Sequence, residues 1–347
     1  MVLAKTTFVE INDFKFSSEI LEWRNDEITR LNSINQDIIS PSEHKSWLSS
    51  KIKSRETMLL MHFFESKPCG LIKLDKLDQN NFGISINLNP EFRGKKLSSL
   101  IISKSLHHLI KQGDYSNINI LASIKHSNIP SIKSFERSGF KQIENENSKE
   151  LLLFKKNLKR ISNILFLGYS SNETSLIKHL KNLGYDVTFE NTKLENTALK
   201  KYDFVISYGY RHILTKEHLS NSKQPPINLH ISYLPFNRGS HPNFWAYYDK
   251  TPHGVTIHQI DEGIDTGLLL LQKKIELNDE MTLRTSYYLL REEIEKLFID
   301  NTDNLLYSTL KTYRNNFPGS FHLVKDLPKD VDWDLTINEY KDKKSSE

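Results

Sequence analysis

The sequence of 347 residues holds a single cysteine, Cys69, and no long apolar run. One cysteine cannot form a disulfide within the chain, which fits a reducing compartment. No stretch reaches the ~18 apolar residues that a membrane-spanning helix needs. The sequence therefore favours a cytoplasmic protein that does not cross a membrane. Cys69 is expected to be a small buried hydrophobe in a strand.

A strong charge of one sign is also lacking. The chain has 47 Lys and Arg against 43 Asp and Glu, a formal net charge of +4. This mild excess allows an anionic substrate such as a nucleotide but does not call for DNA or RNA. A hydrophobic content of 37% is typical of a globular chain. The length suggests about two domains.

The first 156 residues show mixed helix and strand patterns. Ser40, Pro41 and Glu43 predict a helix start, with Ser40 as N-cap and Glu43 completing a capping box. The remaining patterns predict strands at 58–64, 70–74, 81–87, 118–122 and 151–154, and helices at 97–110 and 130–138.

Four motifs lie within this half: Trp23-Arg24-Asn25, Glu43-His44 with Trp47-Leu48, Asn89-Pro90-Glu91 with Arg93-Gly94, and Asn128 through Ser131 to Gly139-Phe140. They resemble the GNAT acetyltransferases, and most closely the branch that acetylates 4-amino sugars on nucleotide carriers in pseudaminic acid synthesis. The resemblance implies an α+β GNAT-like domain over residues 1–158.

Two features depart from that family. Its members usually have small residues in the turn before the long helix, where backbone amides hold the pyrophosphate of coenzyme A, but Lys96 and Ser98 occupy those positions here. Many relatives also have a tyrosine that protonates the departing thiolate, where this chain has Phe135. We therefore expect this half to have lost acetyl transfer and not to use acetyl-CoA. Three alternatives stay open for this half: an acetyl-CoA-dependent amino-sugar N-acetyltransferase, as the main activity or as the second one of a bifunctional protein; a substrate-binding module; or a module that forms a homodimer.

A regular alternation of predicted strands and helices begins at Asn163. Strands are predicted at 164–168, 186–189, 203–207 and 227–232, with a helix from 171 or 172 to 183. This alternation predicts a doubly wound α/β sheet with parallel strands, in which ligands bind beyond the carboxyl ends of the strands. No dinucleotide fingerprint and no Walker lysine motif is present, so neither NAD nor ATP is expected.

Polar side chains of three kinds stand out in this half. Asn228 and His230 alternate with apolar residues, so they project from one face of a strand, roughly 7 Å apart. Asp265 lies in a loop, 261–267, that contains two glycines. A carboxamide can donate to an oxyanion, an imidazole can move a proton, and a carboxylate can hold the imidazole. His230, His241, His258 and Asp265 could ligate zinc by residue type, but their spacing matches no metal motif, so no metal is expected.

Five motifs follow in order: 207–214, Asn228-Leu229-His230, Leu234-Pro235 with Arg238-Gly239, 254–257, and 261–267. They resemble the folate-dependent formyltransferases, which act on methionyl-tRNA, glycinamide ribonucleotide or nucleotide-linked amino sugars. The resemblance implies a formyltransferase domain over residues 159–347, with Asn228, His230 and Asp265 as its catalytic residues.

The same resemblance implies the ligands. N10-formyltetrahydrofolate is expected as co-substrate, in a slot formed by Tyr210, Arg211, Ile213, Leu214, Ile260, Asp261 and Gly263. The acceptor amine is expected to face Arg238, Ser240, His241 and Asn243. Because both halves resemble enzymes for the same amine, the expected acceptor is a nucleotide-linked amino-dideoxy sugar, such as a UDP-4-amino-4,6-dideoxy sugar of pseudaminic acid or another surface glycan. Methionyl-tRNA enzymes carry a further barrel domain, for which too few residues follow here, so tRNA is not expected as substrate.

Overall fold

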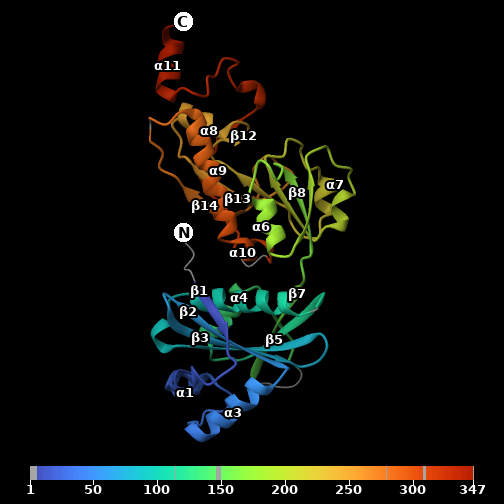
Figure 1. The fold of residues 1–347 in the computed structure, drawn as a ribbon, viewed down its shortest axis with the longest axis vertical. Coiled ribbons are helices and arrows are strands. Elements are labelled where there is room, and N and C mark those ends of the chain that lie inside the picture. The colour runs from blue at the N-terminus through green and yellow to red at the C-terminus, as the bar shows by residue number, and fades with distance from the viewer. Residues whose placement is uncertain (1–5, 114, 146–149, 279, 308–309, 347) are drawn as a thin grey trace. The chain divides into compact units, whose positions relative to one another are not determined.

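The computed structural model describes residues 6–113, 115–145, 150–278, 280–307 and 310–346. The chain divides into two compact units between Arg160 and Ile161, two residues beyond the boundary expected from the sequence. Each unit has its own large sheet (Figure 1).

The N-terminal unit is built on a seven-stranded sheet in the order β1-β2-β3-β4-β5-β7-β6. Its neighbours pair antiparallel except β4 and β5, which run parallel and pair only over Asn81–Gly83. The strands are β1 (Thr6–Glu10), β2 (Thr57–Phe64), β3 (Lys67–Lys76), β4 (Asn81–Leu88), β5 (Asn117–Lys125), β6 (Lys141–Ile143) and β7 (Leu151–Lys159).

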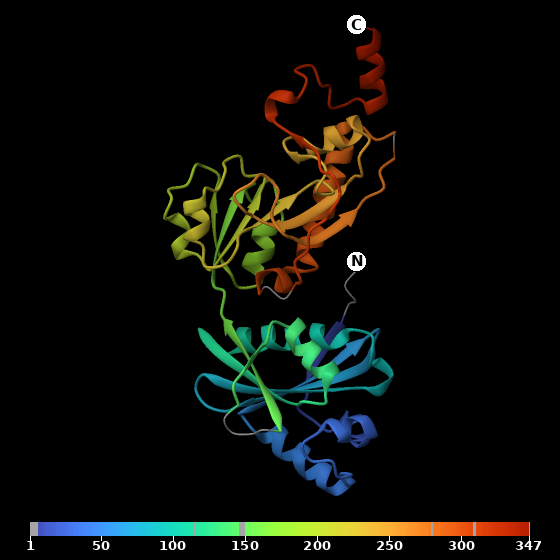
Figure 2. The same cartoon turned by 180° about the vertical axis from the view of Figure 1, so that it is seen from behind.

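Helices cover both faces of this sheet. Figures 1 and 2 show α4 on one face and α1 with α3 on the other. The helices are α1 (Ser17–Asn25), α2 (Glu27–Asn32), α3 (Pro41–Lys53), α4 (Leu97–Gln112) and α5 (Ile129–Arg137), with a 3-10 turn, η1 (Pro90–Phe92). The unit therefore has the α+β arrangement predicted from the sequence.

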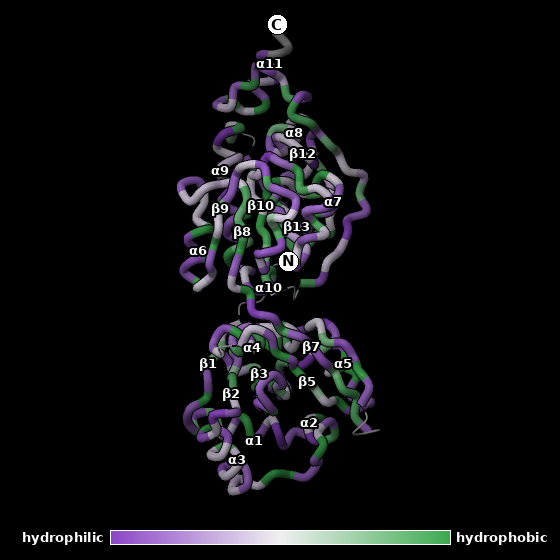
Figure 3. The backbone as a smooth tube through the Cα atoms, turned by 90° about the vertical axis from the view of Figure 1, so that its right-hand side faces the viewer, coloured by the Kyte–Doolittle hydropathy of each residue, from purple (hydrophilic) through white to green (hydrophobic). Residues whose placement is uncertain are grey.

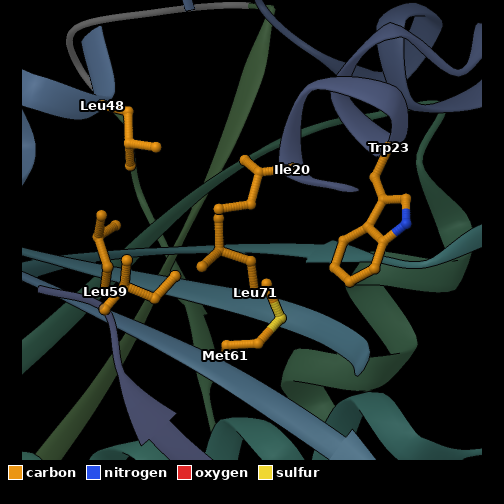
Figure 4. Close-up of a cluster of buried hydrophobic side chains, with 7 residues drawn as sticks. Ile20, Trp23, Leu48, Leu59, Met61 and Leu71 are labelled. Atoms are coloured by element: carbon orange, nitrogen blue, oxygen red, sulfur yellow. The ribbon is translucent and has the colours of Figure 1, made fainter. Parts of the chain in front are cut away.

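Apolar side chains fix α1 and α3 to the sheet. Ile20, Trp23 and Leu48 point from the helices onto side chains of β2 and β3 (Figure 4), namely Leu59, Met61 and Leu71. The predicted capping box of α3 is confirmed: Ser40 Oγ accepts from Glu43 N at 3.3 Å, and Glu43 accepts from Ser40 N at 2.8 Å.

The C-terminal unit is built on a six-stranded sheet in the order β14-β13-β11-β10-β8-β9. The strands are β8 (Asn163–Gly168), β9 (Asp186–Glu190), β10 (Phe204–Tyr208), β11 (Ile227–His230), β13 (Gly254–Gln259) and β14 (Leu269–Lys274). The four strands β9, β8, β10 and β11 are parallel, which confirms the doubly wound α/β fold. Two antiparallel strands, β13 and β14, extend one edge.

Both faces of the parallel part are buried. Leu165, Leu167 and Val205 pack on one face, while the intervening Ile164 and Phe166 are buried on the other. Apolar stretches follow the central strands β8 and β10 (Figure 3). The helices are α6 (Leu176–Asn182), η2 (Ala198–Lys201), α7 (Lys216–Ser220), α8 (Pro242–Tyr248), α9 (Leu283–Ile299) and α10 (Thr302–Leu306).

Helix α6 begins later than the sequence predicts. The carboxylate of Glu173 accepts a hydrogen bond from Ser170 N at 2.9 Å, which forms a turn where the helix was expected to start. Regular helix begins only at Leu176.

The chain from residue 310 to 346, here called the C-terminal arm, contains β15 (Phe321–His322), η3 (Val324–Asp326) and α11 (Ile337–Ser346) (Figure 2). Strand β15 pairs with β12 (Arg238–Gly239), which follows β11 closely in the chain. Trp333 and Tyr340 are aromatic residues of the arm. Both pack into one cluster with Phe244 of α8, and Tyr340 is only 2% exposed. Among the described residues, no helix has both the length and the apolar character that crossing a bilayer requires.

Candidate active site

Asn228, His230 and Asp265 meet at the end of β11. Asn228 Nδ2 donates to Asp265 Oδ1 at 3.2 Å, and His230 Nδ1 lies 3.6 Å from Asp265 Oδ2. Asn228 and His230 share one face of the strand, while Ile227 and Leu229 are buried on the opposite face. The alternation seen in the sequence therefore places the amide and the imidazole together.

The loop between β13 and β14 holds Asp265. Gly267 is required there, because an added Cβ would lie 1.8 Å from the carbonyl oxygen of Gln259. Asp261 Oδ1 closes the loop by accepting from Gly263 N at 3.1 Å and from Thr266 Oγ1 at 2.6 Å. Asp265 itself has φ +53° and accepts from Gly239 N at 2.8 Å. Its carboxylate is thus fixed from the backbone as well as from the side chains.

The surroundings lower the pKa of both groups of the pair. Burial alone would raise the pKa of Asp265, but His230, His258 and the N–H of Gly239 outweigh it and hold that pKa well below its usual range. Burial lowers the pKa of His230, with the charge of Asp265 acting in the opposite direction. The site therefore joins a firmly ionised carboxylate to an imidazole that can accept a proton.

The structure adds a second imidazole, His258, which the sequence indicated only as a zinc candidate. It faces Asn228 because β11 and β13 pair antiparallel in that register. His258 Nε2 lies 3.3 Å from both Asn228 Nδ2 and Asp265 Oδ1, while its Nδ1 donates to Gln259 O at 2.7 Å. Neutral His258 therefore accepts from Asn228, and protonated His258 donates to Asp265. The sequence signal that could have indicated His258 is its position as a polar residue on the strand that pairs with β11.

Within the described parts of the chain, no group of three or more His, Cys, Asp or Glu side chains is arranged to hold a metal ion. His241, the remaining member of the zinc alternative, stacks on Trp333 with ring centroids 5.9 Å apart.

The residues expected to contact the folate lie in three groups. Tyr210, Leu214 and Ile260 pack into one apolar cluster, and Asp261 and Gly263 belong to the loop that holds Asp265. Two further side chains of this set, Arg211 and Ile213, are exposed. The first group forms part of the core and the second presents polar groups and main chain.

The residues expected to face the acceptor amine differ in their surroundings. The Asn243 amide is buried and donates to Leu283 O at 2.8 Å and to Ser286 Oγ at 3.1 Å, so it joins α8 to α9. Ser240 Oγ lies 2.6 Å from His241 Nδ1. The guanidinium of Arg238 lies over the ring of Phe321, at 5.9 Å.

A cavity of about 280 Å³ adjoins the catalytic strand. It begins at Ile231, the residue after His230. Its walls are mostly aromatic and include one guanidinium: His241, Pro242, Asn243, Phe244, Arg284, Tyr287, Tyr288 and Trp333. The sequence patterns did not indicate the contributions from α9 and the C-terminal arm.

Comparison with known proteins identifies both halves. Residues 167–302 match the formyl transferase family, and residues 12–141 match the acetyltransferase (GNAT) domain family. The crystal structure of the formyltransferase PseJ from Anoxybacillus kamchatkensis, in complex with UDP-4,6-dideoxy-4-formamido-L-AltNAc and tetrahydrofolate, has 37% sequence identity. That match covers 51% of this chain and 97% of PseJ, with a TM-score of 0.48.

Two further relatives match parts of the chain. Methionyl-tRNA formyltransferase of Thermodesulfovibrio yellowstonii is 42% identical over 104 residues, 30% of this chain and 34% of the relative. The bifunctional polymyxin resistance protein ArnA of Wigglesworthia glossinidia brevipalpis is 30% identical over 183 residues, 49% of this chain and 27% of the relative. The chain thus spans at most about half the length of the curated relatives it matches.

The folds and the two matches define a two-domain protein, with a GNAT domain followed by a formyltransferase domain. Residues 167–302 thus carry a formyl transferase domain, and residues 12–141 a GNAT domain.

Proposed function

We propose that the C-terminal unit transfers a formyl group from N10-formyltetrahydrofolate to the amine of a nucleotide-linked amino-dideoxy sugar. The convergence of Asn228, His230 and Asp265 at the end of β11 carries this proposal. Formyl transfer passes through a tetrahedral centre, which requires a donor for the oxyanion, a base for the amine and a group that orients the base. The site supplies one of each.

The residues divide the work as follows. His230 takes the proton that the attacking amine loses and returns it to N10 of the folate as the C–N10 bond breaks, a role worth ~10²–10⁴ in rate. An N–H of Asn228 stabilises the oxyanion, worth ~10²–10³. Asp265 stabilises the imidazolium that His230 becomes. The products are a formamide and tetrahydrofolate, so atoms and protons balance without a metal.

His258 shares the side-chain amide of Asn228 with Asp265. Asn228 Nδ2 lies within hydrogen-bond distance of both His258 Nε2 and Asp265 Oδ1. The developing oxyanion therefore replaces one of these two partners as the acceptor of an N–H of Asn228.

The surroundings of the site suit both ligands. The partly exposed Tyr210 and Ile260 offer apolar surface for a pterin, and the exposed Arg211, nearby in sequence, offers a cation for its anionic tail. The cavity beside Ile231 fits a nucleotide, because Tyr287, Tyr288 and Trp333 offer aromatic faces. Arg284 adds a cation for a diphosphate, although Asp334 already accepts from its Nε at 2.6 Å.

The finer assignment is a UDP-linked 4-amino-4,6-dideoxy sugar of pseudaminic acid synthesis. It is supported by the 37% identity to PseJ, whose crystal structure holds a UDP-linked 4-formamido sugar. A panel of acceptors decides between this sugar, its dTDP-linked counterparts and methionyl-tRNA. Each is offered as acceptor with N10-formyltetrahydrofolate, and formylated products are identified by mass spectrometry.

The catalytic assignment is tested with His230→Ala, assayed on the acceptor found in that panel. We expect kcat to fall by ~10²–10⁴, because the base is lost. The matched control is His126→Ala, which removes an exposed imidazole from the N-terminal unit and should leave formylation unchanged. Full activity in His230→Ala would refute the proposal.

A further inference from the structure

Asn237 contacts the ring of His230 through its main chain. Its main-chain oxygen lies 3.2 Å from His230 Nε2, on the opposite side of the ring from Nδ1, which faces Asp265. A carbonyl oxygen can only accept a hydrogen bond, so His230 Nε2 must carry a proton. Neutral His230 then has its lone pair at Nδ1.

Every other polar atom of Asn237 is also engaged. Its side-chain Nδ2 donates to Thr251 Oγ1 at 2.7 Å, and its N–H donates to Ser320 Oγ at 2.8 Å. Ser320 Oγ in turn lies 2.9 Å from Asn237 Oδ1. Asn237 has φ +55° and is 0% exposed. Asparagine tolerates this left-handed conformation better than most residues do, which fits its place in this turn.

The C-terminal arm packs directly against this turn. Gly319 is needed for the approach, because an added Cβ would lie 2.4 Å from Pro235 O. Ser320 O accepts from Arg238 N at 3.1 Å, and β15 then pairs with β12. The arm therefore contacts Asn237 and its neighbours Pro235 and Arg238, although Ser320 lies 83 residues from Asn237 in the sequence.

We infer that Asn237 is a positioning residue for formyl transfer: its main-chain carbonyl holds His230 in the Nε2–H tautomer, and Ser320 of the C-terminal arm holds that carbonyl in place. The consequence for catalysis rests on the proposed function. Nδ1, beside Asp265, is then the atom that receives the amine proton. In the opposite tautomer Nδ1 would already carry a proton and donate to Asp265, and His230 could not act as a base from that side. The tautomer therefore decides which ring nitrogen can act as the base.

The tautomer is measured directly, without substrate, so its outcome is independent of the reaction assignment. The full chain is labelled with ¹⁵N-histidine, and the His230 signals are assigned by their loss in His230→Gln. We expect the resting protein above the titration of His230 to show protonated Nε2 and unprotonated Nδ1. A resting protein with the proton on Nδ1 would overturn the inference.

The role of the arm is tested with Ser320→Ala, which removes both hydrogen bonds to Asn237. We expect kcat to fall about tenfold with little change in KM for either substrate, and the ring signals to show both tautomers. The charged or titratable groups facing His230 are Asp265 and His258, whose ring centroid is 6.3 Å away. Neither is changed by this substitution.

The pH profile gives a readout that a merely structural role would not move. The carbonyl of Asn237 stabilises the imidazolium, so loosening it lowers the pKa of His230. Neutral His230 then persists to lower pH, and the acid limb of the kcat profile should shift to lower pH.

The matched control is Ser220→Ala, which changes an exposed serine on α7 and should leave kcat, the tautomer and the pH profile unchanged. Wild-type behaviour of Ser320→Ala in all three would show that the arm has no part in holding His230. If Ser320→Ala does not fold, Asn237→Gly replaces it, because glycine keeps the positive φ and loses only the side-chain hydrogen bonds.

Discussion

The backbone of Asp265 adopts a conformation that few residue types accept. Its φ of +53° lies in the left-handed region, where Asn and Asp are enriched among residues with a Cβ. Its carboxylate accepts from Gly239 N and Asn228 Nδ2 and lies beside two imidazoles. Geometry and charge can therefore be separated at this position, because asparagine preserves the shape and the conformation but removes the charge.

We predict that Asp265→Asn lowers kcat by ~10²–10⁴, because the His230 imidazolium loses its counter-ion. The pH dependence of the free energy of unfolding should also change. The folded-state pKa of Asp265 is depressed. Its contribution to stability is therefore fully present above the ordinary value of about 4. That contribution is lost as the pH falls through the lower folded value. Urea unfolding at a series of pH values should show the stability difference between wild type and Asp265→Asn shrinking below about pH 4. A difference that widens on acidification would contradict this sign.

Cys69 shows a side chain whose character follows from its surroundings. It is 0% exposed on β3 and packs with Phe92 and Leu97, which confirms the buried position predicted from the sequence. Burial raises the pKa of its thiol to about 11.

We therefore predict that Cys69 does not react with a thiol reagent at pH 8 while the protein is folded, because the thiolate is the reactive form. In urea the same thiol should react fully. Cys69→Ser combined with Ser123→Cys, which places a thiol at an exposed position of β5, is the matched control and should react while folded. Rapid reaction of native wild type would show that β3 is more accessible than its packing indicates.

At the scale of single elements, the start of α3 offers a change with a known size. Ser40→Ala removes the N-cap acceptor for Glu43 N. We expect a loss of about 1 kcal/mol in the stability of the N-terminal unit. Thermal unfolding followed by circular dichroism measures this loss. Ser50→Ala lies on the same helix away from the cap and should cost less. Formylation should be unaffected by either change, and a Ser40→Ala protein as stable as wild type would contradict the role of the cap.

The elements that the sequence predicted well are those whose signals are local. The α3 cap depends on residues three apart, and the common face of Asn228 and His230 depends on residues two apart. His258 depends on the register between β11 and β13, which no local pattern fixes. The C-terminal arm depends on packing between Trp333 and His241 and on Ser320 reaching Asn237. Such contacts join residues 83 or more positions apart, and their polar and aromatic side chains resemble those of a solvated tail.

At the scale of the whole molecule, two units from different families share one chain. We propose that Asn228, His230 and Asp265 give the formyltransferase unit the groups that its chemistry requires, whereas the sequence predicts that the GNAT unit has lost acetyl transfer. Lys96 precedes α4 with φ +59° and an exposed side chain. Arg93, in the same turn, donates to Asp26 and to Thr29 Oγ1, so its guanidinium is already engaged within the unit.

The last prediction concerns acetyl-CoA. The turn before α4 has Lys96 at the helix N-cap, where relatives have a small residue, and this disfavours close approach of a pyrophosphate to the backbone. The guanidinium of Arg93 in the same turn is already engaged by Asp26. Phe135 is 2% exposed against Phe140 and has no proton to give a thiolate. We expect the full chain, supplied with acetyl-CoA, N10-formyltetrahydrofolate and the amino-sugar nucleotide, to yield formylated but not acetylated product. Calorimetry should show millimolar or absent acetyl-CoA binding. Phe135→Tyr is the informative companion, because it restores the hydroxyl without changing the turn and should remain inactive. Micromolar binding with an acetylated product would instead establish a bifunctional enzyme.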